Sequence, residues 1–290
     1  MTVRGLFVSG DGRPRAGWRI AVFLVLFTVI GLVFTTIIGP LESITRWSGV
    51  GDAGGEVTLL LSIIATHAVM LRWVDRRPWS SVWLGTGAAR PRLFGFGFAL
   101  GALPILAASL VLLAVHWLSI EPAAAGSWVG SAVRMSAVLL PSALFEELTS
   151  RGYVFAALRD GLGAPVAVGT TSLGFGLLHL GNSGATAQSI VLVTLAGVFL
   201  AAVVLATQSL YAAWAAHFAW NWVMAVPLHV SVSGVAVPRP GYQTVDTGPD
   251  WATGGPWGPE GGAFAAAAML AGLAWLYVRH RSAQRKTQNA

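Results

Sequence analysis

The chain has 290 residues, of which 55% are hydrophobic and 10% are charged, and its mean hydropathy is +0.67. Soluble domains carry about 25% charged residues, so this composition excludes an ordinary soluble protein and indicates a polytopic membrane protein. The formal net charge is +6 and there is no cysteine. Basic residues in membrane proteins set the orientation in the bilayer, so we expect no nucleic-acid partner, and disulfides, thiolate metal sites and a cysteine nucleophile are excluded.

Apolar runs recur along the whole chain. A membrane span needs about 20 mostly apolar residues. The sequence therefore predicts an all-α, polytopic transmembrane helical bundle of about eight spans, which forms one integral membrane domain over residues 1–290. The expected spans are 18–38, 57–74, 93–118, 129–158, 165–180, 187–207, 211–228 and 263–278.

The segments between these runs divide by charge. With the N-terminus inside, the inner segments hold all but three of the 18 Lys and Arg residues, the exceptions being Arg46, Arg134 and Arg239. Short cytoplasmic loops collect basic residues, so we expect both termini, including a basic tail at residues 279–290, to be cytoplasmic. A single lysine, Lys286, in a chain rich in Arg, Ala and Gly indicates a bacterial plasma membrane as the location.

A stretch rich in glycine and proline, residues 238–262, separates the last two runs. This composition disfavours both a helix and a packed core, so we expect an extracytoplasmic loop. Its Trp251 and Trp257 are expected to lie at the headgroup boundary, where tryptophan is enriched.

Two of the 12 acidic residues, Glu146 and Glu147, fall in the middle of the fourth run. A charge at mid-bilayer costs at least about 2.5 to 3.5 kcal/mol, so the pair must find polar partners. Arg151 follows Glu147 by one helical turn, and this acid-then-base order favours an ion pair. Adjacent helix positions point about 100° apart, which leaves Glu146 as a separate carboxylate with a tunable charge.

Two histidines are candidate partners of Glu146. His179 ends the fifth run one turn after Phe175, and His217 lies in the seventh run one turn before Asn221, so the members of each pair share a helix face. With a turn near residues 160–163, Glu146 and His179 differ in depth by about 5 Å. The sequence therefore predicts that they meet across a helical hairpin.

Other polar and small residues in the runs are interpreted more simply. His67 and His116 lack a polar neighbour of similar quality at helical spacing and are expected to be packing residues. Gly97 and Gly101 have the G-x-x-x-G spacing of closely packed membrane helices. In a chain with 35 glycines this match is expected by chance, and we assign it no role.

Three patterns, Glu146-Glu147-x-x-x-Arg151, Phe175-x-x-x-His179 and His217-x-x-x-Asn221, follow one another on successive apolar runs. Together they resemble the CPBP family, which comprises CAAX-processing proteases and bacteriocin-processing or immunity proteins and is also called the Abi family. The resemblance covers roughly residues 129–228, which would form the catalytic core helices.

The resemblance implies an intramembrane endopeptidase that acts on protein or peptide substrates in or at the lipid bilayer. Glu146 would be the general base toward a water that His179 also holds, and His217 and Asn221 would bind the oxyanion. Glu147 and Arg151, together with Phe175, would support the site. No cofactor is required in this mechanism.

A zinc ion held by Glu146, His179 and His217 is the alternative way to activate water. The sequence lacks the H-E-x-x-H helix of zinc proteases. The amide of Asn221 also suits an oxyanion better than zinc, so the glutamate mechanism is favoured.

Three further hypotheses are weighed against the endopeptidase. A rhomboid-type serine protease would use Gly-Asn-Ser-Gly at 181–184 with His217 as base, but it leaves the glutamate pair without a role. A non-catalytic immunity or scaffold protein of the same fold predicts a broken motif, whereas all motif residues are present. A proton-coupled transporter predicts internal repeats, which we do not find. The sequence does not define the oligomeric state or the substrate.

Overall fold

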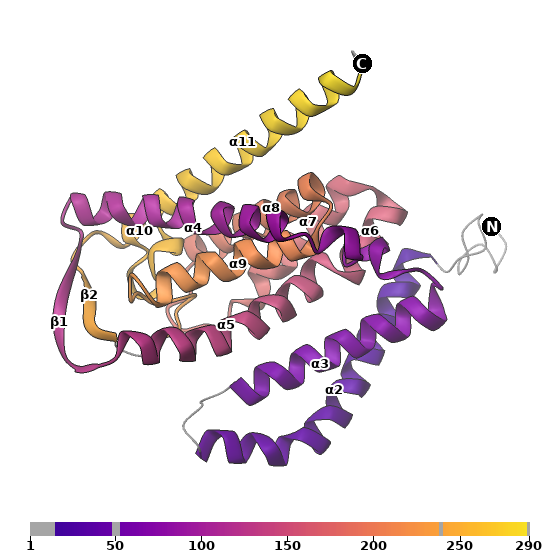
Figure 1. The fold of residues 1–290 in the computed structure, drawn as a ribbon, viewed down its shortest axis with the longest axis horizontal. Helices are drawn as coiled ribbons and strands as arrows, with labels where there is room; N and C mark the ends of the chain where they lie inside the picture. Colours follow the sequence, from indigo (N-terminus) through magenta and orange to yellow (C-terminus); the bar gives the residue numbers. More distant parts are fainter. Residues whose placement is uncertain (1–14, 48–52, 238–239, 289–290) are drawn as a thin grey trace.

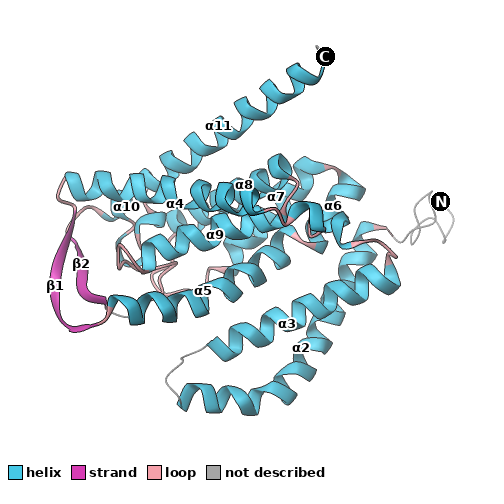
Figure 2. Ribbon diagram, viewed as in Figure 1, coloured by secondary structure: helices cyan, strands magenta, loops and turns pink. Residues whose placement is uncertain are grey.

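The computed structural model describes residues 15–47, 53–237 and 240–288 (Figure 1). Arg4 and Arg13, which the charge pattern assigned to the inner side of the membrane, and Arg239, which it assigned to the outer side, lie outside these residues. The described chain is mostly helical, with one pair of strands (Figure 2). The longer elements are α2 (Ala16–Trp47), α3 (Ala53–Val69), α4 (Pro91–Ala114), β1 (Leu118–Gly126), α5 (Trp128–Arg151), α6 (Tyr153–Leu162), α7 (Ala164–Leu178), α8 (Ala187–Thr207), α9 (Leu210–Ala225), β2 (Pro240–Asp246) and α11 (Ala263–Gln288).

Short helical turns join these elements. A π-helical turn, η1 (Met70–Val74), extends α3, and the 3₁₀ turns η2 (Trp79–Val82) and η3 (Thr86–Ala88) lead into α4. Before α11 the chain forms α10 (Asp250–Thr253), η4 (Gly255–Trp257) and η5 (Pro259–Gly261).

Every expected apolar run forms helix over most of its length, which confirms the all-α polytopic fold of an integral membrane protein. Within the described residues, five segments are long and apolar enough to cross a membrane alone: Ala16–Pro40, Gly55–Val74, Pro91–Ala114, Trp128–Leu162 and Ala187–Thr207. Helix α7 and the apolar part of α11 are shorter, and α9 has 16 residues. The expected runs are therefore not spans of equal length.

The fourth run is two helices rather than one, because α5 and α6 meet at Gly152. A Cβ at Gly152 would lie 2.4 Å from Nε2 of His67, so glycine is what admits this ring. His67 is fully buried. Its Nδ1 donates to the Ile63 carbonyl at 2.8 Å, and its Nε2 accepts the Tyr153 N–H at 3.0 Å. The neutral imidazole of His67 thus accepts the first backbone N–H of α6, which has no partner within that helix.

His116 differs from the expected packing residue. The helix of the third run ends at Ala114, and His116 is exposed in the turn that follows, with φ of 59°. The interpretation as a packing residue is therefore wrong for His116, because the run stops being helical before this position.

Helix α9 lies at the centre of the bundle, in contact with α4, α5 and α8 (Figure 1). The approach to α4 is close. A Cβ at Gly97 would lie 2.0 Å from the Ala212 carbonyl oxygen, and one at Gly101 would lie 1.9 Å from that of Ala216. The G-x-x-x-G spacing is therefore a true helix contact and not a chance match.

The Gly/Pro-rich segment is more ordered than its composition suggests. Strand β2 pairs antiparallel with β1, with Ile120 opposite Thr244, and Trp257 is fully buried while Trp251 is 56% exposed. The expectation of an unpacked loop with Trp257 at the headgroups is wrong. Glycines explain the difference: Gly258 has φ of 102°, and a Cβ there would lie 2.1 Å from the Ser231 carbonyl oxygen. A chain with such residues can pack densely without regular structure.

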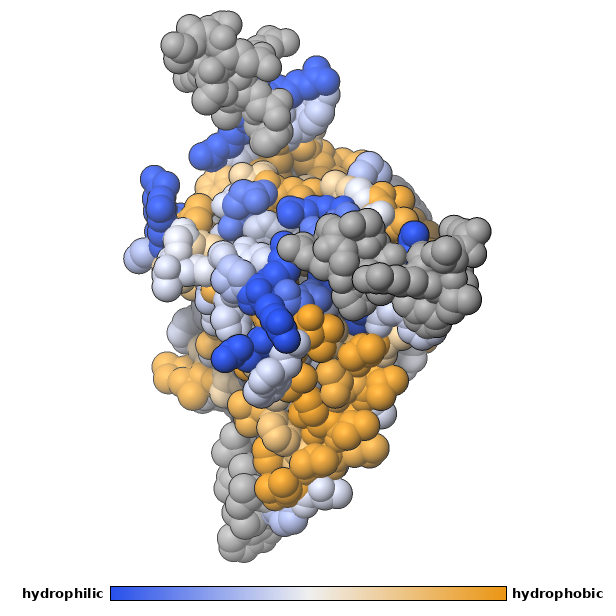
Figure 3. All heavy atoms as spheres, turned by 90° about the vertical axis from the view of Figure 1, so that its right-hand side faces the viewer, coloured by the Kyte–Doolittle hydropathy of each residue, from blue (hydrophilic) through white to orange (hydrophobic). Residues whose placement is uncertain are grey.

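Ion pairs gather at the opposite end of the bundle, near α6. Arg19 contacts Asp75 at 2.5 Å, and Tyr153 donates to the same carboxylate at 2.9 Å. Arg77 pairs with Asp160. Figure 3 views the molecule from this side, where hydrophilic residues gather beside an extended apolar surface. The start of α2 and the end of α11 both point to this side (Figure 1).

The close contact between α4 and α9 gives a first prediction. Gly101→Ala should lower the free energy of unfolding by about 1 to 3 kcal/mol, because the methyl group forces two backbones apart. Gly95→Ala on the same helix is the control, since a Cβ there has no atom within 4 Å. Thermal unfolding in detergent measures both. Equal stability of the two variants would contradict the close packing.

Candidate active site

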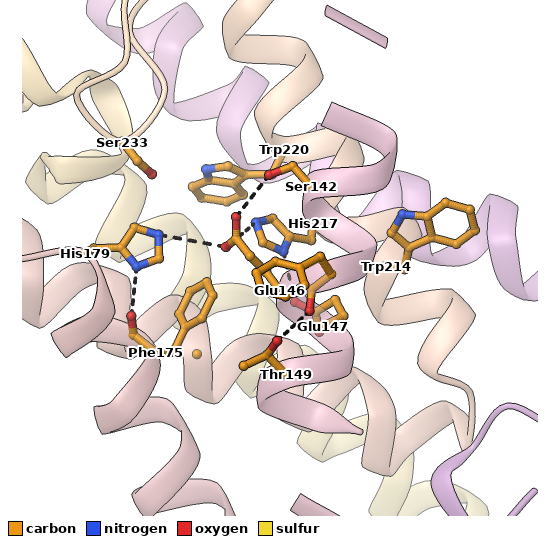
Figure 4. A network of polar contacts seen from close by, with 12 residues as sticks. Ser142, Glu146, Glu147, Thr149, Phe175, His179, Trp214, His217, Trp220 and Ser233 are labelled. Atoms are coloured by element: carbon orange, nitrogen blue, oxygen red, sulfur yellow. Dashed lines mark hydrogen bonds and ion pairs between the residues drawn. The ribbon is translucent and has the colours of Figure 1, made fainter. Parts of the chain in front are cut away.

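The carboxylate of Glu146 lies between two imidazoles (Figure 4). Its Oε2 is 3.8 Å from Nε2 of His179 and 3.8 Å from Nε2 of His217. The three side chains come from α5, from the end of α7 and from α9. The expectation that they meet across the hairpin is therefore confirmed. The Ser142 hydroxyl donates a hydrogen bond of 3.4 Å to the other carboxylate oxygen of Glu146, Oε1.

A backbone contact fixes the tautomer of His179. Its Nδ1 lies 2.8 Å from the carbonyl oxygen of Phe175, one turn earlier on α7. A carbonyl only accepts hydrogen bonds, so Nδ1 carries the proton. In the neutral ring Nε2 then presents a lone pair toward Glu146, and the two groups face one another as acceptors.

Glu147 is fully buried and bridges two cationic or basic groups. Its Oε1 accepts from Arg151 at 3.0 Å and contacts Nδ1 of His217 at 2.9 Å. Arg151, also fully buried, donates to the carbonyl of Gly197 on α8 at 3.0 Å. Its guanidinium stacks 4.4 Å from the centre of the Phe175 ring. The Glu147–Arg151 pair was expected, whereas the bond to His217 was not.

Asn221 lies one turn after His217 on the wall of a small cavity of about 40 Å³. His179, His217, Trp220 and Phe175 also line this cavity. The structure thus brings Asn221 to the same space as both histidines. Phe175 packs against both rings, with ring centres 4.8 Å from His179 and 5.9 Å from His217.

A further carboxylate, Glu260 of η5, lines the same cavity and was missed. Its Oε2 accepts from Trp220 Nε1 at 3.0 Å, and its Oε1 accepts from the N–H and the hydroxyl of Ser233, each at 2.7 Å. Glu260 therefore fastens the Gly/Pro-rich segment to α9 beside Asn221. No local spacing links it to His217, which lies in another element.

In the described residues, Glu146 and the two imidazoles lie farther apart than the ligands of a bound zinc ion would. Tetrahedral zinc with bonds of about 2.05 Å sets its ligands about 3.3 Å apart, whereas Glu146 is 3.8 Å from each imidazole. Within the described ranges no three His, Cys, Asp or Glu side chains form a group that fits a metal ion.

Comparison with protein families finds a match. Residues 128–223 match the family model of the type II CAAX prenyl endopeptidase Rce1-like proteins. We refer to residues 128–223 as the Rce1-like domain. The match is consistent with the CPBP resemblance, begins at the start of α5 and ends within α9, and includes every residue of the three patterns. No curated protein and no solved structure matches the chain.

In the Rce1-like domain, His217 is not positioned to activate a serine as the nucleophile. Both ring nitrogens of His217 face the glutamate pair, Nδ1 toward Glu147 and Nε2 toward Glu146. Ser183 instead packs its backbone against Gly234, where a Cβ would lie 1.9 Å from its carbonyl oxygen. This geometry disfavours the rhomboid-type alternative.

The buried ion pair of the Rce1-like domain gives a second prediction. Arg151→Gln should destabilise the protein by about 3 to 5 kcal/mol, because it leaves the Glu147 carboxylate buried without its cation. Arg134→Gln, an exposed position on the same helix, should have little effect. Thermal unfolding in detergent tests both, and a wild-type midpoint for Arg151→Gln would show that the pair does not hold the fold.

The Glu260 contacts give a third prediction. Glu260→Gln keeps the shape but sets an amide N–H against either Trp220 or Ser233, so the variant should lose about 1 to 3 kcal/mol of local stability. Hydrogen exchange of residues 229–235 should become faster. Glu121→Gln, exposed on β1, is the control. Unchanged exchange in Glu260→Gln would contradict the proposed fastening.

Proposed function

We propose that this protein is an intramembrane endopeptidase that hydrolyses a peptide bond with a water activated by Glu146 and His179. The observation that carries the proposal is the pair of facing acceptors, Glu146 Oε2 and His179 Nε2, 3.8 Å apart. A water donates one hydrogen to each and keeps a lone pair for the substrate carbonyl carbon. Membership of residues 128–223 in an Rce1-like family supports peptidase chemistry.

In the first step Glu146 takes a proton from this water while the oxygen attacks the carbonyl carbon. The carbonyl oxygen becomes an oxyanion, which needs hydrogen-bond donors in a site of low dielectric. The amide of Asn221 is one donor. The C–N bond then breaks as Glu146 returns the proton to the leaving amine, so protons balance over the cycle.

His217 is the second donor when its ring is protonated. Its Nδ1 is held by Glu147 at 2.9 Å, which leaves Nε2–H for the oxyanion. The local charges support this state, because two carboxylates, Glu146 and Glu147, face a single guanidinium, Arg151. An imidazolium at His217 brings the sum of these charges to zero.

The proposed substrate is a peptide or a membrane-associated protein. None of the contacts in the site requires this substrate to be prenylated. We place the end of the bundle that holds Arg19, Arg77 and α6 in the cytoplasm, which agrees with the positive-inside rule. Both termini would then be cytoplasmic, in a bacterial plasma membrane.

Peptide cleavage by the detergent-purified protein tests the proposal. Glu146→Gln should lower turnover by about 10² to 10⁴-fold, because the amide cannot accept the proton from water. Membrane insertion and thermal stability should be retained, and Glu121→Gln should cleave at the wild-type rate. The assay uses a broad library of membrane peptides.

A chelator arm separates the two ways of activating water. Cleavage that is lost in Glu146→Gln and survives chelation supports the glutamate mechanism. Loss on chelation with recovery on added zinc would replace it by a metal mechanism, and normal cleavage by Glu146→Gln would rule out the role of Glu146 as base.

A further inference from the structure

Helix α11 packs against α4 and α8 at its start and diverges from the bundle toward its end (Figure 1). An apolar cavity of about 470 Å³ lies between α4 and α11, lined by residues such as Leu103, Ala107, Ala268 and Trp275. A second cavity of about 410 Å³ is bordered by Arg92 and Arg279. Phe96 lines both, so the two cavities are neighbours, and together we call them the α4–α11 wedge.

The charged end of the wedge carries two exposed arginines. The Arg279 guanidinium stacks 4.6 Å from the ring centre of Phe96 and 5.3 Å from that of Trp275. Arg92 stands at the start of α4 on the same cavity. Within the described residues neither arginine forms an ion pair, so both guanidinium groups are available to an anion.

The order of these features follows the order of groups in a phospholipid. Arg92, at the start of α4, and Arg279, in the second half of α11, mark one end of the wedge. The aromatic pair Phe96 and Trp275, whose ring centres are 5.8 Å apart, comes next. The apolar part then continues toward the middle of both helices. Basic pockets between membrane helices suit acidic headgroups, and aromatic residues suit the interface.

We propose that the α4–α11 wedge binds an anionic glycerophospholipid, with its phosphate between Arg92 and Arg279 and an acyl chain along α4 and α11. Charge complementarity selects this occupant over a zwitterionic lipid. The proposal is independent of the peptidase chemistry, because none of the residues that line the wedge belongs to the Glu146 site.

Native mass spectrometry of the full chain tests the site. The detergent-solubilised protein is mixed with phosphatidylglycerol or with phosphatidylcholine of the same acyl chains, and the lipid that stays bound after detergent removal is measured. The wild type should retain phosphatidylglycerol preferentially. The double variant Arg92→Gln/Arg279→Gln should bind it roughly 20- to 30-fold more weakly, because each arginine near an anionic lipid contributes about one kcal/mol. The pair Arg72→Gln/Arg281→Gln removes the same charge from exposed positions outside the wedge and should bind as the wild type does.

A second pair of variants tests the apolar part without touching charge. Ala271→Trp fills the groove and should weaken phosphatidylglycerol binding, whereas Ala267→Trp, exposed on α11 but outside the groove, should not. Thermal unfolding in phosphatidylcholine checks that each variant is folded.

Three outcomes would overturn the proposal. They are equal retention of the two lipids by the wild type, wild-type binding by Arg92→Gln/Arg279→Gln, and competition by glycerol phosphate at the same concentration as the lipid. The last would show a site for a soluble anion rather than for a lipid.

Discussion

The fully buried carboxylate of Glu147 is the constraint on which the candidate site depends. An ionised carboxylate in an apolar bundle is stable only if cations and donors surround it. Arg151 and His217 both contact its Oε1, and Arg151 also donates to the Gly197 carbonyl. The Glu147–Arg151 pair thereby ties α5 to α8 through Arg151 and to α9 through Glu147.

Two adjacent glutamates take different roles because a helix turns about 100° per residue. Glu147 points into the bundle and is fully buried, whereas Glu146 is 27% exposed and faces two imidazoles. Glu147 balances Arg151 and contacts His217, so the proton transfer that we propose falls to Glu146. Burial thus separates the carboxylate that holds the helices together from the one proposed to activate water.

Local spacing predicted the parts of the site that lie on one helix, such as Glu147 with Arg151 and Phe175 with His179. The depth estimate from helix length and a short turn brought His179 to Glu146, although the fourth run is two helices that meet at Gly152. Contacts between distant elements were not predictable in this way. Glu260 reaches Trp220 from a segment whose glycines indicated a loop, and His67 reaches Tyr153 only because Gly152 lacks a side chain. Such contacts depend on tertiary packing, which periodicity does not encode.

Helix α11 connects the candidate active site with the proposed lipid site. Its Met269 is buried and lines the cavity beside His179 and His217, while its Ala271 and Trp275 line the wedge toward α4. Contacts on one edge of a helix limit its movement on the other edge, because closely packed side chains transmit displacement. A lipid between α4 and α11 would therefore fix the cavity wall through Met269, even though it lies outside the Glu146 site.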